Sequence, residues 1–224
     1  MTYLYDCHVH TAETSWCGRV PAGEMAQLYK QAGYTGIVIT DHYFKEYFEA
    51  MPEDWSWEAK IEHYLAGYRE AYREGQRIGL EVLLGMELRF HNRIEDYLVY
   101  GLTPEFLVEH PHLYDHTVES FIHFSRTHNL LIIQAHPFRT GQEPAPADCL
   151  DGVEVYNGNS GHDSRNHLAL DYAEKHGLIQ VSGSDAHRVV EVGAGGIWID
   201  KVVHTSMELA DYLRQHPVPK RKAA

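Results

Sequence analysis

Residues 36–42 read Gly-Ile-Val-Ile-Thr-Asp-His, and this stretch decides the class of fold. Its apolar run, Ile37–Ile39, is continuous instead of alternating, as expected for a strand that is covered on both faces. A helix is expected before it, at residues 22–32, with Pro21 near its start and Gly33 just past its end. Longer amphipathic segments and short apolar runs alternate after it. This order predicts an α/β fold with parallel strand pairing.

The alternation continues along the chain without a low-complexity linker, a repeat or an abrupt change in composition. The expected strands are Tyr3–His8, Gly36–Thr40, Val82–Glu87, Tyr97–Tyr100, Leu130–Gln134, Gly152–Val155, Ile179–Ser182 and Gly196–Ile199. The expected helices are Ala22–Ala32, Ile61–Ile78, Thr117–Thr127, Asn166–His176 and Ser206–Gln215. We therefore expect a single domain over residues 1–216. Residues 217–224, which include the basic run Lys220–Lys222, are expected to form a flexible tail.

Most of the expected strands end in, or are followed at once by, a chemically capable side chain. These residues are His8, His10, Asp41, His42, Glu87, His136, Asn157, Asp185 and His187. Side chains at the carboxyl ends of successive strands converge only when the sheet curls back on itself. An open sheet would spread them along a line. We therefore expect a closed α/β barrel with its functional site at one mouth.

The residue types at these strand ends are those that bind metal ions. His8 and His10 are two apart in extended chain, so both imidazoles point to the same side. Glu87 ends an apolar strand, where an unpaired charge is costly without a compensating cation or donor. Asp185 and His187 repeat the spacing of two near the end of the chain. Mixed imidazole and carboxylate ligands favour manganese, iron or zinc over calcium.

The bulk properties exclude several classes of protein. The formal net charge of −13 argues against a nucleic-acid polymer as partner, because such a surface needs basic residues to replace phosphate counterions. No apolar stretch approaches the roughly 18 residues of a membrane span. The N-terminus lacks the basic start and apolar block of a secretion signal, and the three scattered cysteines make no disulfide framework. We expect a cytoplasmic protein that does not bind membranes.

Five motifs together resemble the PHP (polymerase and histidinol phosphatase) superfamily. They are His8-Val9-His10, Thr40-Asp41-His42, Glu87, His136-Pro137 and Gly183-Ser184-Asp185-Ala186-His187, in the family's order across nearly the whole chain. The resemblance implies a distorted, TIM-like (β/α)7 barrel that holds two or three divalent ions, usually manganese, iron or zinc. It also implies hydrolysis of phosphate esters by metal-activated water.

Carried over position by position, the resemblance also implies a set of ligands. Those for the first ion are His8, His10, Glu87 and Asp185. Glu87 is expected to bridge to a second ion held by His136. His42 and His187 match the remaining ligand positions, which hold a third ion in trimetallic members. We expect Glu87, Asp185 and His187 to be the catalytic residues.

The sequence departs from the family pattern at two places. Many members carry a further histidine near the fourth strand, where this chain has Asp96, a candidate oxygen ligand. Members also often carry an Asp or His shortly after the first motif, where this chain has Cys17. Cys17 is a candidate soft ligand for zinc or iron, although a buried, inert thiol is the preferred interpretation.

The expected substrate is a small phosphorylated molecule, cut as a phosphate monoester in the manner of histidinol phosphatase. Arg19, in the loop after the first motif, and Arg165, at a helix start, are the candidate phosphate contacts. Three alternatives stay open: a phosphodiesterase acting on nucleotides, an amidohydrolase that cuts carbon–nitrogen bonds, and a degenerate metal-binding module. The second is disfavoured because amidohydrolases commonly bridge their metals through a modified lysine at a strand end, and no expected strand ends in lysine.

Overall fold

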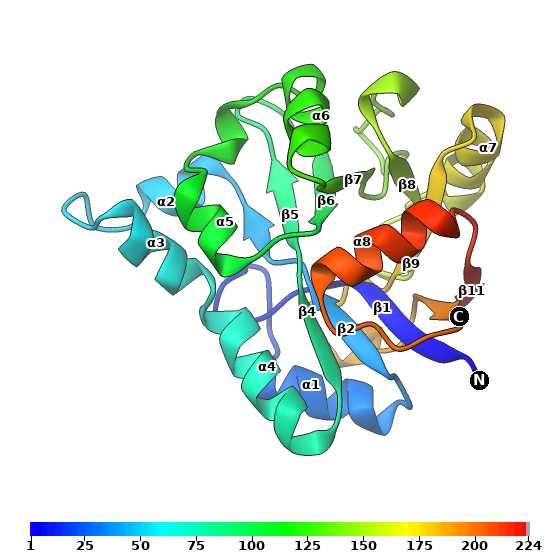
Figure 1. Cartoon of the computed structure of the whole chain (residues 1–224), viewed down its shortest axis with the longest axis horizontal. Coiled ribbons are helices and arrows are strands. Elements are labelled where there is room, and N and C mark those ends of the chain that lie inside the picture. The colour runs from blue at the N-terminus through cyan, green and yellow to red at the C-terminus, as the bar shows by residue number, and fades with distance from the viewer. Residues whose placement is uncertain (223–224) are drawn as a thin grey trace.

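The computed structural model describes residues 1–222 and arranges the chain as two hydrogen-bonded sheets with helices packed against them (Figure 1). The strands of the first sheet, in spatial order, are β11 (Lys220–Lys222), β10 (Gly196–Ile199), β1 (Tyr3–Val9), β2 (Gly36–Ile39) and β4 (Glu81–Leu84). Those of the second are β3 (His42–Tyr43), β5 (Met86–Arg89), β6 (Asp96–Tyr100), β7 (Leu131–Gln134), β8 (Gly152–Asn157) and β9 (Ile179–Gly183).

The helices lie between the strands in the expected alternation. They are α1 (Ala22–Gln31), α2 (Lys45–Glu49), α3 (Trp57–Tyr64), α4 (Ala66–Ile78), α5 (Pro104–Glu109), α6 (Val118–Thr127), α7 (Asn166–His176) and α8 (Ser206–Gln215). All five helical segments expected from the sequence are present, and the long one is divided at Leu65 into α3 and α4. Within residues 1–222 no helix combines the length and apolar character that crossing a membrane requires.

The strand directions correct one expectation, because both sheets are mixed instead of wholly parallel. β6 runs antiparallel to β5 and to β7, while β3–β5 and β7–β8–β9 pair in parallel. The connection from β5 to β6, residues 90–95, is shorter than the dozen or so residues that a parallel crossover needs. In the first sheet, β10 likewise runs antiparallel to β1.

The two sheets are joined where their strands end. The expected strand over residues 82–87 divides at Gly85, so that β4 belongs to one sheet and β5 to the other. A bridge between Val9 and Ala186 joins the end of β1 to the segment after β9, and the amide of Asp185 donates to the carbonyl of His8 at 2.9 Å. Closure into a single seven-stranded barrel stays a prediction.

The basic run near the C-terminus is a strand, which corrects the expectation of a flexible tail there. Lys220–Lys222 forms β11 and pairs antiparallel with the edge strand β10. The ammonium of Lys222 also donates to the carbonyl of Gly193 at 2.7 Å. These backbone and side-chain bonds hold the segment on the sheet, although its composition reads as a solvated tail. The rest of the expected tail at residues 223–224 lies outside the described residues.

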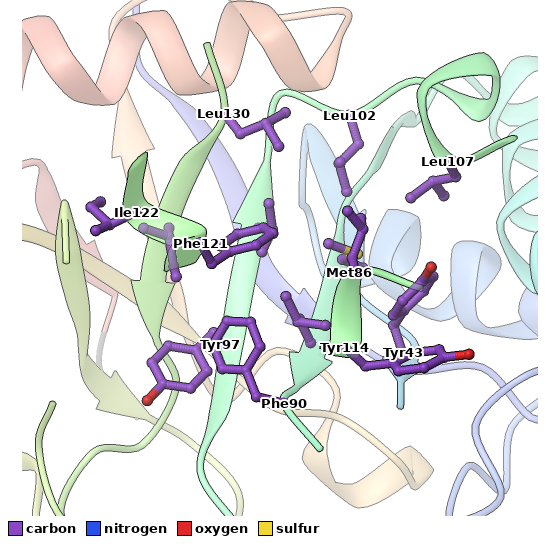
Figure 2. Packing of buried hydrophobic residues seen from close by; sticks show 14 of the residues in the cluster. Tyr43, Met86, Phe90, Tyr97, Leu102, Leu107, Tyr114, Phe121, Ile122 and Leu130 are labelled. Carbon is purple, nitrogen blue, oxygen red and sulfur yellow. The ribbon is translucent and has the colours of Figure 1, made fainter. Parts of the chain in front are cut away.

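The larger apolar core fixes the second sheet under helices α3, α5 and α6 (Figure 2). Phe121 of α6 is fully buried, and its ring centroid lies 5.5 Å from that of Phe90. Leu107 of α5 and Met86 of β5 are fully buried in the same cluster. Burying one such side chain stabilises a fold by about 1.5–3 kcal/mol. This packing holds the ends of β5, β6 and β7 in fixed positions.

Candidate metal centre

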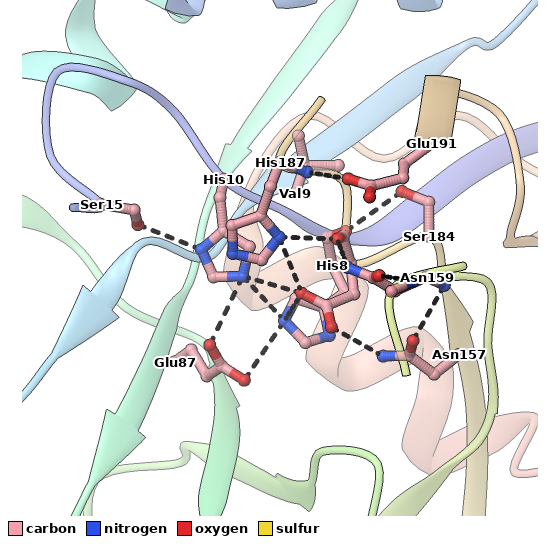
Figure 3. Close-up of polar contacts among 12 residues, drawn as sticks. His8, Val9, His10, Ser15, Glu87, Asn157, Asn159, Ser184, His187 and Glu191 are labelled. Carbon is pink, nitrogen blue, oxygen red and sulfur yellow. Dashed lines mark hydrogen bonds and ion pairs between the residues drawn. The ribbon is translucent and has the colours of Figure 1, made fainter. Parts of the chain in front are cut away.

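The two histidines of the first motif meet at the junction of the sheets. His8 lies in β1 and His10 directly after it, and both side chains are fully buried. Their Nε2 atoms are 3.0 Å apart. Figure 3 shows these two rings gathered with that of His187 beside the carboxylate of Glu87.

The hydrogen bonds of His8 and His10 fix which ring nitrogens are free. Nδ1 of His8 lies 3.0 Å from Oε1 of Glu154, and a carboxylate only accepts, so Nδ1 of His8 donates. Nδ1 of His10 lies 3.1 Å from Oγ of Ser15, whose hydroxyl donates to Asp41 at 2.7 Å. His10 therefore also donates from Nδ1. In the neutral tautomers the two Nε2 atoms then face each other as lone pairs, an arrangement that needs a cation between them.

His136 presents a third lone pair to the same place. Its Nδ1 lies 3.0 Å from Oε1 of Gln142, whose amide nitrogen donates to the carbonyl of Ile94 at 2.9 Å. Oε1 of Gln142 is therefore the acceptor and Nδ1 of His136 the donor. In the neutral ring, Nε2 of His136 then faces Oε1 of Glu87 at 3.2 Å as a lone pair against a carboxylate oxygen, so this nitrogen takes up either a proton or a metal ion.

Glu87 lies at the centre of the cluster. Its Oε1 is 3.3 Å from Nε2 of His8, and its Oε2 is 2.7 Å from Nδ1 of His42 and 3.4 Å from Nε2 of His10. Within residues 1–222, the buried Oε2 has no hydrogen-bond partner in acceptable geometry. A carboxylate so deeply buried needs positive charge beside it, which a divalent ion supplies.

The electrostatics of the site show what a metal ion must displace. Burial disfavours a charge on His8, but the surrounding carboxylates, led by Asp185, outweigh it and raise the pKa of His8 well above its ordinary value. Burial also opposes ionisation of Glu87, yet the neighbouring imidazoles hold the pKa of Glu87 well below its usual range. Burial and the nearby His187 lower the pKa of His10 well below its ordinary value. Without metal the site therefore holds protons on some imidazoles, and cations compete with them.

Seven of the eight predicted ligands come together in overlapping groups whose ligand atoms lie within 4.8 Å of one another, and the eighth, His136, contacts Glu87 instead. The groups are His8, His10 and Asp185; His10, His42 and His187; and His42, Glu87 and Asp96. Their imidazole and carboxylate atoms fit divalent transition metals. Two candidate ligands also carry backbone strain, because His136 and Asp185 have φ angles of 29° and 52°. Left-handed backbone at non-glycine residues costs on the order of 1–3 kcal/mol and concentrates at functional sites.

A family model, the PHP domain, matches residues 6–207 of the chain. The chain belongs to the PHP domain family. At the level of that family it is a metal-dependent phosphoesterase, and therefore a hydrolase. No curated protein matches the sequence.

Solved structures share the fold of this PHP domain at low sequence identity. PsfC from Pseudomonas syringae PB-5123 is 17% identical with a TM-score of 0.68, over 100% of this chain and 92% of the other. A two-domain protein containing a predicted PHP-like metal-dependent phosphoesterase, from Bacteroides vulgatus ATCC 8482, is 14% identical with a TM-score of 0.62. The match covers 94% of this chain and 62% of that protein. The lesion-specific endonuclease PfuEndoQ from Pyrococcus furiosus is 16% identical with a TM-score of 0.63. The match covers 99% of this chain and 58% of the endonuclease.

At the position near the fourth strand where many family members carry a histidine, this PHP domain has Asp96. Asp96 is buried beside Glu87 and His42, but it also accepts two hydrogen bonds from the guanidinium of Arg89, at 2.8 and 3.0 Å. An ion bound there therefore shares Asp96 with a fixed arginine.

Cys17 is not the buried, inert thiol that the sequence favoured. It is exposed and lines the cavity beside the metal centre. Although the residue as a whole is exposed, its thiol group is partly buried, which opposes ionisation. Hydrogen bonds with His187 and His42 outweigh this effect and lower the pKa of Cys17 to about 6. A thiolate is thus favoured next to two candidate ligands.

Sequence reasoning missed Glu154, the residue that orients two candidate ligands. Glu154 is fully buried in β8; besides contacting His8, its Oε2 accepts from the amide of His136 at 3.0 Å. Asn157 donates to Oε2 of Glu154 at 2.9 Å and to Oδ2 of Asp185 at 3.2 Å. A signal was present, because Glu154 stands in an apolar strand just as Glu87 does.

A cavity of about 330 Å³ opens over the metal centre. The arginines that line it are Arg19, Arg89, Arg139 and Arg188. Arg89 is paired with Asp96, and Arg188 with Glu191. Neither Arg19 nor Arg139 has an ion-pair partner in the described part of the chain.

The structure does not bring Arg165 to this cavity. Arg165 is exposed at the start of α7, and its guanidinium donates to Oγ1 of Thr140 at 3.4 Å. His162, three residues earlier, does line the cavity, and its Nε2 lies 3.3 Å from Oδ2 of Asp185.

Proposed function

We propose that this PHP domain hydrolyses a phosphate monoester of a small molecule, with two or three divalent ions of manganese, iron or zinc. The observation that carries the proposal is the set of lone pairs and carboxylate oxygens aimed at one another around Glu87, beneath a cavity lined by arginines. Such a site attracts metal cations at its floor and an anion at its mouth.

The chain's own residues have distinct roles in this proposal. His8, His10, His42, His136, His187, Glu87 and Asp185 hold the ions, and Asp96 contributes an oxygen beside Arg89. When bound, the ions activate a water molecule and offset the charge of the phosphoryl group. Arg19 attracts and orients the phosphoryl oxygens from the rim. Glu154 and Asn157 keep the ligands fixed, so that little reorganisation is needed during the reaction.

The size of the cavity supports a small substrate. About 330 Å³ is at the lower end of the volumes that accommodate drug-sized ligands. The net charge of −13 also favours a small substrate over a nucleic-acid polymer. We further propose that the two sheets are the halves of one distorted (β/α)7 barrel, whose mouth is this cavity.

The test is a rate comparison on protein whose metal content has been measured. The protein is loaded with manganese, iron or zinc and supplied in turn with a monoester (phenyl phosphate), a diester (diphenyl phosphate) and an anilide of a simple acid. We expect the monoester to be cut with the highest kcat/KM, and Glu87→Gln to remove that activity together with bound metal. Faster cleavage of the diester would replace the proposal with a phosphodiesterase.

The remaining alternatives have less support. Within residues 1–222 no lysine lines the cavity, which argues against a metal-bridging modified lysine of the amidohydrolase kind. A degenerate binding module is disfavoured because the ligand atoms converge. Metal binding without cleavage of any ester would restore that alternative.

A further inference from the structure

Trp16 is a large apolar side chain at the edge of the metal cavity that remains 60% exposed. It precedes Cys17, which lines the cavity. The rings of Trp16 and Phe44 meet edge to face, with centroids 5.3 Å apart and planes at 86°, and the ring centroid of Tyr47 lies 6.0 Å from that of Trp16. These two contacts fix the indole in place while most of its surface stays open to solvent.

A second hollow of about 320 Å³ begins at this indole. The residues of its wall that matter here are Trp16, Phe44, Arg89, Phe90, His91 and Arg93. Arg89 lines both this hollow and the metal cavity. The ring of Phe44 also lies 6.3 Å from that of the candidate ligand His42. The side hollow therefore directly adjoins the place where the phosphoryl group is held.

Arg89 forms a fixed ridge between the two spaces. Asp96 holds its guanidinium with two hydrogen bonds, and the guanidinium carbon lies 5.7 Å from the centroid of the Phe44 ring. Arg93, which also lines the hollow, is paired with Glu95 at 3.0 Å. The hollow thus has an aromatic wall and two arginines that are already paired, and the carboxylate of Glu46, which has no ion pair within residues 1–222, also lines it. It therefore does not call for a second anion.

We propose that the side hollow receives a planar aromatic group carried by the leaving alcohol of the phosphate ester, stacked on Trp16. The inference rests on the proposed phosphoesterase function and specifies its substrate class. An indole offers a large, rigid face for an aromatic ring. An aliphatic group of the same size would gain only the burial of its surface.

The stacking contact lies away from the reacting phosphorus, so it is made equally in the bound substrate and in the transition state. Losing it therefore raises KM and leaves kcat unchanged. A general disturbance of the metal centre would instead lower kcat. This difference separates a specificity role for Trp16 from a structural one.

The experiment uses two matched pairs of substrates with the metal-loaded protein. Benzyl phosphate is compared with cyclohexylmethyl phosphate, and adenosine 5′-monophosphate with ribose 5-phosphate. Within each pair the leaving group is a primary alcohol, and the aromatic ring is the main difference. The variants are Trp16→Leu and Trp16→Phe. Trp55→Leu is the control, because Trp55 is 39% exposed and packs on His63 away from both hollows.

We expect Trp16→Leu to raise KM about fivefold to tenfold for the aromatic member of at least one pair, with its non-aromatic partner unaffected. Trp16→Phe should keep most of the preference, and Trp55→Leu all of it. Equal loss for aromatic and non-aromatic esters, or no loss for either, overturns the inference.

A binding measurement keeps the inference testable if no ester is cut. Adenosine and benzyl alcohol, the aromatic products, are titrated while tryptophan fluorescence is followed. We expect at least one of them to change the emission of the wild type and of Trp55→Phe but not that of Trp16→Phe. An unchanged emission of the wild type with both products would reject the stacking site, whereas absent hydrolysis alone rejects only the proposed function.

Discussion

Nδ1 of His8 lies 3.0 Å from Oε1 of Glu154, and both side chains are fully buried. This bond fixes the tautomer of His8 and aims its Nε2 at the cluster around Glu87. A carboxylate behind a ligating imidazole also increases the basicity of the ring. Glu154 is therefore a positioning residue for the metal centre.

We predict that Glu154→Gln lowers the affinity for the bound metal by about tenfold to 100-fold. The amide keeps a hydrogen bond to His8 but removes the negative charge behind the ring. Metal affinity is measured by competition with a coloured chelator, and Glu174→Gln on the exposed face of α7 is the control. Because the prediction concerns the metal, unfolding of the metal-free protein should change much less than the affinity. Equal metal affinity in the two variants would show that Glu154 does not support the ligand.

Gly183 is a place where a single methyl group is predicted to remove the metals. A Cβ built at Gly183 would overlap the Cβ of His8, so Gly183→Ala must displace that strand and its ligand. Gly23→Ala is the control, because there a Cβ meets only the side chains of Glu70 and Glu74, no closer than 3.5 Å, and alanine favours helix. We expect Gly183→Ala to lose metal, measured by elemental analysis, and Gly23→Ala to bind as the wild type does. Full metal content in Gly183→Ala would contradict the close approach.

The sequence predicted the local elements well because each had a local cause. Continuous apolar runs marked buried strands such as β2, and Gly177 closes α7 in a left-handed conformation, as glycine permits. Strand direction was harder to predict. The reversal of β6 follows from the short connection before it, and the sequences of β5 and β6 themselves do not differ from those of parallel strands. β11 was missed because its basic composition is typical of a tail, and only pairing with β10 makes it a strand.

The convergence of the candidate ligands was predictable for a different reason. They are histidines and carboxylates at the ends of apolar strands, where charge must be compensated, and the motif order resembled a known family. Glu154 was missed because its role depends on which imidazole lies across the sheet junction. Arg165 does not line the cavity, because a position near a helix start says nothing about where a long side chain points. Both differences concern contacts between segments far apart in the sequence.

The metal-free protein is predicted to lose stability as the pH rises from neutral. Burial opposes protonation of His136, but its contacts with Glu87 outweigh this and raise the pKa of His136 to about 9. The folded value lies above the ordinary value of about 6.5. The protonated ring therefore stabilises the fold fully below about pH 6.5, and this contribution is lost as the pH rises through about 9.

Urea unfolding in the presence of a chelator, repeated across that pH window, measures the effect. We expect the free energy of unfolding to fall by on the order of a few kcal/mol. His136→Gln should remove the slope that His136 contributes, and loading with metal should remove it as well, because a metal ligand carries no proton. A flat profile for the metal-free wild type would show that the ring is not protonated at neutral pH.

Arg19 and Arg165 were equal candidates in the sequence, and the structure separates them. Arg19 lines the cavity over the metals and has no ion-pair partner within residues 1–222, so its guanidinium is available to an anion. Arg165 is exposed and donates to Thr140 outside that cavity.

A charge-assisted hydrogen bond contributes about 1.5–3 kcal/mol, which corresponds to roughly tenfold to 100-fold in affinity. We therefore expect Arg19→Ala to reduce kcat/KM for a phosphate monoester by that factor and Arg165→Ala to leave it within about twofold of the wild type. Inhibition by inorganic phosphate should weaken in parallel in Arg19→Ala, since phosphate carries the same oxygens without a leaving group. If Arg165→Ala were the damaging variant, its side chain would have to reach the cavity in the complex with substrate, and the assignment of the rim would be wrong.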